Sequence, residues 1–223
     1  MKTRKILSYS EFMELNKQRN YRQAFDLACA SLNGKDLKER AEKAGADYRK
    51  DDRGERITVL FFSEPYTVLF PRVDIYSPGK KTISLVVRAL LLHYLLKADG
   101  VRPAGNWAAY KDLPGGLLYA SVFARRATDP LIKRFGKSAK SFQEAGRLLG
   151  GVPEKVGDAS FSLLAFPRVP LQYVLWEGDE EFPASAQLLF DSAVDHYLPL
   201  EDIVVLGQIT TGRLISLSTR AAR

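Results

Sequence analysis

Residues 160–176, SFSLLAFPRVPLQYVLW, decide the fold class of this 223-residue chain. Residues 160–166 and 171–176 are two apolar, mildly alternating runs of strand length, and two prolines flank Arg168 between them. A connection of four residues between such runs predicts an antiparallel β-hairpin. Because a hairpin needs no crossover helix, this part of the chain favours a sheet built from local strand pairs.

A second strand-rich region lies upstream, at residues 56–62, 66–70 and 72–76, where β-branched and aromatic residues predict three antiparallel strands. Between the two β regions, residues 83–96 are apolar on nearly every side apart from Arg88 and His93. A helix of that kind is surrounded by other elements. The sequence therefore predicts a central apolar helix over residues 82–98, with Thr82 or Ser84 as its cap.

The remaining elements are predicted to be helical: residues 11–32, 36–44, most of 117–151, one helix from about Pro183 to Tyr197, and one from about Leu200. Grouped strands and grouped helices are typical of an α+β fold. We expect an antiparallel or mixed sheet packed against the central apolar helix, with an N-terminal helical hairpin. We divide the chain into an N-terminal helical extension, residues 1–50, and a single α+β domain, residues 51–223.

Composition excludes several kinds of site. The one cysteine, Cys29, excludes an intrachain disulfide and any cysteine-ligated zinc or iron–sulfur centre made by this chain alone. Two histidines exclude a three-histidine zinc site, and we predict no metal. The longest apolar run is too short to span a membrane, and residues 1–11 lack the apolar core of a signal peptide. We expect a cytoplasmic protein with a small-molecule or protein partner, an unknown cofactor and no membrane partner.

Charge is divided unevenly along the chain. Residues 169–212 contain eight carboxylates and no Lys or Arg, so the formal net charge of +7 divides into about +15 and −8. Four of these carboxylates, Glu177, Asp179, Glu180 and Glu181, fall within five residues. They can cap the helix expected from Pro183, or they can converge on a cation or a general acid–base role. The sequence leaves both interpretations open.

The polar residues nearest to apolar surface define the candidate site. We expect a cleft between the hairpin end at Trp176 and the central helix, covered by a loop from Trp107 to Gly116. The ligand-binding candidates are Arg88, Trp107, Arg168, Trp176, Glu177, Asp179, Glu180, Glu181 and Asp191.

A band of basic residues follows the predicted helices of residues 117–151. It contains Arg125, Arg126, Lys133, Arg134, Lys137, Lys140 and Arg147. The band is either a solvated helix face or a surface for nucleic acid or another anionic partner. Nucleic acid is disfavoured, because Phe135 and Phe142 fit the inward helix face and do not form stacking platforms.

Several motifs together carry a family resemblance. These are residues 157–191, GDASFSLLAFPRVPLQYVLWEGDEEFPASAQLLFD, the run YLPLED at 197–202, LLLHYLLKADG at 90–100 and LPGG at 113–116. The chain resembles the uncharacterised domain family numbered 3786 over residues 24–214. The resemblance implies anaerobic bacteria and archaea as the setting, where corrinoid and one-carbon enzymes are common. It also implies an added iron–sulfur segment in some relatives, whose cysteines this chain lacks.

These observations favour a non-catalytic module over an enzyme. We expect a small-molecule or cofactor-binding or accessory module in anaerobic metabolism. One alternative is a carboxylate-dependent hydrolase or transferase, with or without the assistance of a metal, that uses the four clustered carboxylates. The other alternative is binding of nucleic acid or an anionic partner through the basic band.

Overall fold

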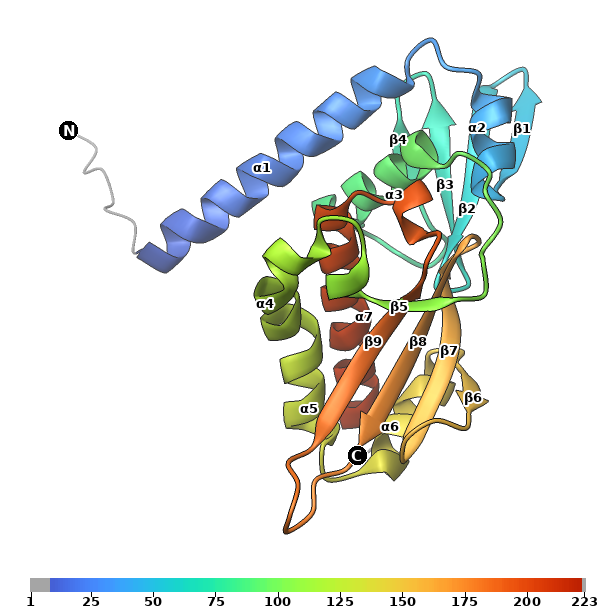
Figure 1. Cartoon of the computed structure of the whole chain (residues 1–223). Helices are drawn as coiled ribbons and strands as arrows, with labels where there is room; N and C mark the ends of the chain where they lie inside the picture. Colours follow the sequence, from blue (N-terminus) through green and yellow to red (C-terminus); the bar gives the residue numbers. More distant parts are fainter. Residues whose placement is uncertain (1–8, 222–223) are drawn as a thin grey trace, which may run out of the picture.

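Two antiparallel sheets and the helices around them form the fold (Figure 1). The structure is a computed structural model and describes residues 9–221, with side chains for residues 18–219. The first sheet has the order β1-β2-β3-β4 and is a meander of Asp47–Asp51, Gly54–Phe61, Glu64–Phe70 and Asp74–Tyr76. The second has the order β5-β9-β8-β7-β6, with strands Trp107–Ala109, Ser185–Asp191, Val169–Trp176, Ala159–Phe166 and Val152–Glu154. The predicted α+β class is confirmed, and β1 is a fourth strand that the sequence reading missed.

The hairpin of β7 and β8 is the centre of the second sheet and joins it to the first. Phe166 pairs with Val169, so the connection is the two residues Pro167 and Arg168, which is shorter than predicted. A register shift between Leu164 and Phe166 bulges the strand at Ala165. The Ala165 carbonyl accepts a hydrogen bond of 2.9 Å from the backbone N–H of Phe62, at the end of β2. The bulge thus releases a backbone acceptor that links the two sheets.

The helix predicted from Pro183 to Tyr197 is wrong. Residues Ser185–Asp191 form strand β9, which pairs along β8 from Trp176↔Ser185 to Leu171↔Phe190. The apolar residues Phe190, Val194 and Tyr197 suggested a helical stripe, but the backbone of β8 needs hydrogen-bond partners on this side, and strand pairing supplies them. Only the short 3₁₀ turn η4, Val194–His196, is helical in this segment.

The apolar helix predicted over residues 82–98 is α3, Leu85–Lys97, and Ser84 is its N-cap. Its core residue is Tyr94, whose ring stacks on Phe166 and Tyr197 with centroids 4.2 and 5.8 Å apart. The Tyr94 hydroxyl donates to the carbonyl of Ala44 at 2.6 Å and accepts from the backbone N–H of Arg168. One side chain therefore joins α3 to the β7–β8 turn and to the end of α2, Leu37–Ala44.

The remaining helices cover the second sheet and one face of α3. Helix α1, Tyr9–Leu32, packs along α3, and its N-terminal part projects away from the rest of the structure (Figure 1). Helix α7 packs against the segment made of α4, the π-helical turn η3 and α5, and against α6. Their bounds are Leu200–Ala221 for α7, Ala120–Phe123 for α4, Ala124–Thr128 for η3, Asp129–Phe135 for α5 and Ala139–Leu148 for α6. The short turns η1, Tyr110–Asp112, and η2, Gly116–Tyr119, precede α4.

None of the helices between residues 9 and 221 has the length and apolarity needed to cross a bilayer.

Candidate functional site at the junction of three helices

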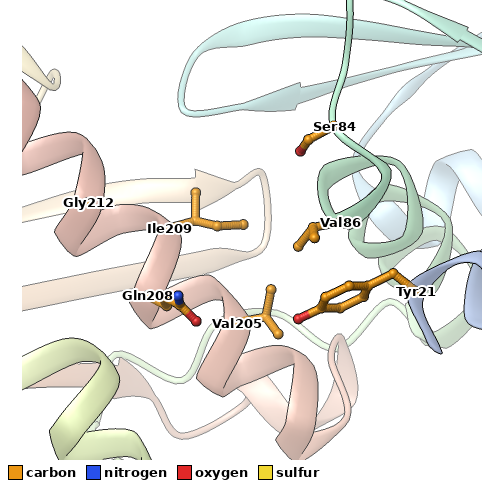
Figure 2. Close-up of a pocket in the computed structure, with 7 residues that line it drawn as sticks. All are labelled: Tyr21, Ser84, Val86, Val205, Gln208, Ile209 and Gly212. Atoms are coloured by element: carbon orange, nitrogen blue, oxygen red, sulfur yellow. The ribbon is translucent and has the colours of Figure 1, made fainter. Parts of the chain in front are cut away.

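A hollow of about 280 Å³ lies where α1, α3 and α7 meet (Figure 2). Its lining is neutral: three side chains carry a hydroxyl or an amide, and the others are aliphatic or glycine. The lining residues are Tyr21, Ser84, Val86, Val205, Gln208, Ile209 and Gly212. In Figure 2 the ring of Tyr21 reaches from α1 towards Val205 on α7.

Local sequence places each wall of the hollow. Val205, Gln208, Ile209 and Gly212 are spaced i, i+3, i+4 and i+7 on α7, so they share one face of that helix. A Cβ built on Gly212 meets no atom within 4 Å, which shows that the missing side chain leaves open space. On α3, Ser84 is held by its capping role, since its Oγ accepts from the backbone N–H of Val87 at 3.4 Å.

His93 joins helix α3 to helix α7. On α3, His93 lies two helical turns beyond Val86, and its Nδ1 is 2.6 Å from Oδ2 of Asp202 on α7. The hydrogen bond to the Asp202 carboxylate raises the pKa of His93, although partial burial acts in the opposite direction. A second hollow of about 310 Å³ lies beside the ring and is lined by His93, Leu96, Lys97 and Pro199.

Arg88 also holds α1 on α3. Its guanidinium carbon lies 4.8 Å from the centre of the Phe25 ring, and its Nη2 lies 3.8 Å from Oδ1 of Asp74 on β4. Phe25, Ala28 and Leu32 are the buried apolar side chains of α1 between residues 18 and 32. Arg88 is therefore a packing residue between α1, α3 and β4.

The acidic loop between β8 and β9 is engaged with backbone amides. Glu177 accepts a hydrogen bond from the backbone N–H of Ala139, at the start of α6. Asp179 accepts from the backbone N–H groups of Glu181 and Phe182 at 2.9 and 2.7 Å, and these bonds lower the pKa of the Asp179 carboxyl. Capping was one of the two interpretations from sequence, but the capped helix is α6 and not a helix from Pro183. Glu180 and Glu181 are exposed.

Asp191 is a structural anchor. It is 2% exposed, and its carboxylate accepts hydrogen bonds from three backbone N–H groups, those of Ala104, Gly105 and Ala193, at 2.7 to 2.9 Å. These bonds tie the loop before β5 to the end of β9, where Trp107 pairs opposite Asp191. The carboxylate thus satisfies amides that would otherwise be buried without an acceptor.

The structure does not assemble the cleft expected from sequence. Arg168 lies in the turn before β8, and Trp176 ends the same strand, so at ~3.3 Å per residue the two lie about 26 Å apart. Arg168 packs near Gly45, and its Nε has no hydrogen-bond partner. The structure brings together Trp107 with Asp191, and Trp176 with the acidic loop. It separates both pairs from Arg88 and Arg168.

Among the residues whose side chains the structure describes, no group of three or more His, Cys, Asp or Glu side chains is arranged so that it could hold a metal ion.

Sequence reasoning missed most of the helix junction. Ser84 was identified only as a possible cap, and His93 only as an exception on an apolar helix. Asp202 lies 109 residues from His93, and no local spacing relates the two. No local pattern in the sequence marked the hollow.

A family model described as Domain of unknown function (DUF3786) matches residues 36–213. The match runs from the cap of α2 into α7 and leaves α1 outside it. No curated protein and no solved structure matches the chain.

Proposed function

The chain belongs to the DUF3786 family, and because the description of that family names no activity, we propose from its geometry that it is a non-catalytic binding module. The ligand site is the hollow between α1, α3 and α7. The observation that carries the proposal is the lining, in which neutral hydrogen-bonding groups and aliphatic side chains from three helices face one space. Ligand pockets combine a mainly apolar wall with a few polar groups in this way.

The lining also defines the class of ligand. The hollow of about 280 Å³ lies just below the usual range for ligand pockets, roughly 300–1,000 Å³. Tyr21 and Ser84 supply hydroxyl groups and Gln208 supplies an amide, while Val86, Val205 and Ile209 supply apolar contact. We expect a small, uncharged and partly apolar molecule, with the amide and hydroxyl groups fixing its orientation.

The geometry gives less support to carboxylate-dependent catalysis. The Glu177 carboxylate caps α6, the Asp179 carboxylate closes a turn, and the Asp191 carboxylate is enclosed by three amides. A general acid working near neutral pH needs a raised carboxyl pKa, whereas the amides around Asp179 lower its pKa. We therefore propose non-catalytic ligand binding, and not catalysis, as the function.

The test is a fragment screen by NMR on the ¹⁵N-labelled full chain. Small neutral fragments should shift the backbone amide signals of Val86, Val205 and Ile209 together. Gly212→Leu places a side chain in the open space beside the hollow and should abolish these shifts while the chain stays folded. Ser216→Leu, one turn further along α7 at an exposed position, is the matched control and should bind as the wild type does. If fragments shift other amides instead, or bind Gly212→Leu equally well, the site is wrong.

A second candidate function is contact with an anionic protein through the basic band. Leu117 and Leu118 on η2 are 73% and 84% exposed, and Arg125 and Arg126 follow on η3. Both arginines are exposed and make no ion pair with the described residues. An exposed apolar pair next to unpaired positive charge is a typical contact surface for an acidic partner. A photo-crosslinker at position 118 would capture such a partner, and Arg125→Glu should abolish its capture.

A further inference from the structure

An exposed apolar turn lies at η2, outside the hollow. Its two leucines, Leu117 and Leu118, are 73% and 84% exposed. The LPGG motif at residues 113–116 builds this turn, because a Cβ on Gly116 would overlap the carbonyl oxygen of Tyr110. The chain therefore folds tightly just before the two leucines and leaves them in solvent. Exposed apolar patches of this kind on soluble proteins mark contact sites.

Positive charge lies beside this apolar turn. Leu118, Ser121 and Arg125 are exposed and spaced i, i+3 and i+7, so one solvent face of the segment from η2 to η3 carries both apolar surface and charge. Arg126 is exposed next to Arg125, and neither arginine forms an ion pair with the described residues. Asp129, the nearest carboxylate along the chain, is exposed and pairs with neither. An occupant that fits this surface supplies an apolar group together with negative charge.

The same chain carries a segment of that chemistry at the tip of the loop between β8 and β9. Phe182 is 67% exposed, and the two residues before it, Glu180 and Glu181, are exposed carboxylates without an ion pair to any described side chain. The backbone N–H of Asp179 donates to the Phe182 carbonyl at 3.0 Å, so the ring is carried on a closed turn. The tip therefore offers an aromatic anchor beside two negative charges, and aromatic residues are enriched in interfaces.

The tip lies too far from η2 for the two to meet within one molecule. Strand β9 begins at Ser185, just after the tip, and its last residue, Asp191, pairs with Trp107 of β5, which leads through η1 into η2. The seven extended residues of β9 place its two ends about 20 Å apart. Figure 1 shows the loop extending past the end of the second sheet, away from α4. A contact between the tip and η2 therefore joins two molecules.

We propose that η2 and η3 form a docking surface for a second copy of this chain, whose tip at Phe182 occupies it. This inference rests on the second candidate function and names its partner. In the contact, the Phe182 ring packs on the two leucines of η2, and the two glutamates of the tip face the two arginines of η3. The tip belongs to residues 169–212, with a formal charge of about −8, and the docking surface belongs to the remainder, with about +15, so the long-range field also favours the pairing.

A contact of this size is weak and depends on salt. One aromatic ring and a few charged groups bury less than the roughly 1,200–2,000 Å² of a stable, specific interface. We therefore expect a dissociation constant between about 10 μM and 1 mM. Added salt should weaken the association, because exposed charges are screened by ions.

Sedimentation velocity of the full chain measures this association directly. The wild type should associate at low salt, and Phe182→Ser or Arg125→Glu should each weaken the association about tenfold or more. Leu164→Ser and Arg72→Glu are the matched controls. Leu164 is 54% exposed on β7, and Arg72 is exposed in the turn after β3, so the controls remove the same kind of group at other surfaces. Both controls should associate as the wild type does.

Mixing the two test variants examines the pairing itself. Phe182→Ser keeps the docking surface and Arg125→Glu keeps the tip, so an equimolar mixture should form a heterodimer although neither variant associates alone. The inference is overturned if the wild type stays monomeric at about 1 mM, if either test variant associates as the wild type does, or if the mixture stays monomeric.

The second candidate function can survive the failure of this inference. If the wild type is monomeric while a photo-crosslinker at position 118 captures a different acidic protein, and Arg125→Glu abolishes that capture, the surface stands and the contact between copies fails. If neither self-association nor capture occurs, both fail.

Discussion

Two glycines on helix α7, Gly207 and Gly212, are expected to respond differently when each is replaced by alanine. A Cβ on Gly207 would lie 2.9 Å from the Phe123 ring, 3.2 Å from Leu188 and 3.3 Å from Ala127, whereas a Cβ on Gly212 meets nothing within 4 Å. Alanine is favoured over glycine inside a helix by about 1 kcal/mol at either position. At Gly207 the overlap with packed neighbours costs about 1–3 kcal/mol, so it cancels or exceeds that gain.

We therefore expect Gly212→Ala to raise the free energy of unfolding by about 0.5–1 kcal/mol. The free energy of unfolding of Gly207→Ala should be about 1–3 kcal/mol lower than that of Gly212→Ala. Urea unfolding followed by circular dichroism measures both, and calorimetry should show a difference in Tm of about 2–4 °C for each kcal/mol in a chain of this size. Equal stability of the two variants would refute the close packing of α7 against η3 and β9, which positions the inner wall of the hollow.

Two further predictions concern candidate residues from the sequence, and a third concerns the exposed turn η2. Asp191→Ala leaves three backbone amides without their acceptor and should lower the free energy of unfolding, measured in urea, by about 3 kcal/mol or more. If Asp191→Ala lost less unfolding free energy than Asp191→Asn, the anchoring role of Asp191 would be contradicted. Glu177→Ala removes the side-chain acceptor at the start of α6 and should cost about 0.5–1 kcal/mol, while Glu180→Ala in the same loop should stay within about 0.5 kcal/mol of the wild type. Leu118→Ser, at an exposed position, should also change the unfolding free energy by less than about 0.5 kcal/mol, and a large loss would show that η2 is buried.

Local patterns in the sequence were enough to predict five of the nine strands between residues 9 and 221, namely β2, β3, β4, β7 and β8, and the helix α3. The alternation in residues 160–176 indicated the hairpin, and the apolar run at 83–96 indicated α3, with Thr82 or Ser84 as its cap; the structure selects Ser84. These features depend on neighbours within a few residues. The error at β9 has the same origin: Phe190, Val194 and Tyr197 fit a helical stripe, and only the long-range pairing with β8 selects a strand.

The candidate site could not be predicted in this way because it depends on contacts between distant segments. The acidic loop and Arg168 are close in sequence but lie at opposite ends of one extended strand. Conversely, Tyr21, Ser84 and Gln208 are far apart in sequence and meet only where three helices pack. The chemical pattern in the sequence therefore pointed to the acidic loop and gave no signal for the hollow.

Native mass spectrometry tests the central claim, that the hollow between α1, α3 and α7 holds a small ligand. The chain would be purified anaerobically from its own source as the wild type, Gly212→Leu and Ser216→Leu, and each would be compared with a denatured aliquot. We predict a bound mass that is lost on denaturation in the wild type and in Ser216→Leu, and that is missing from Gly212→Leu. A bare mass in all three proteins, or the same bound mass in all three, would contradict the assignment of the site.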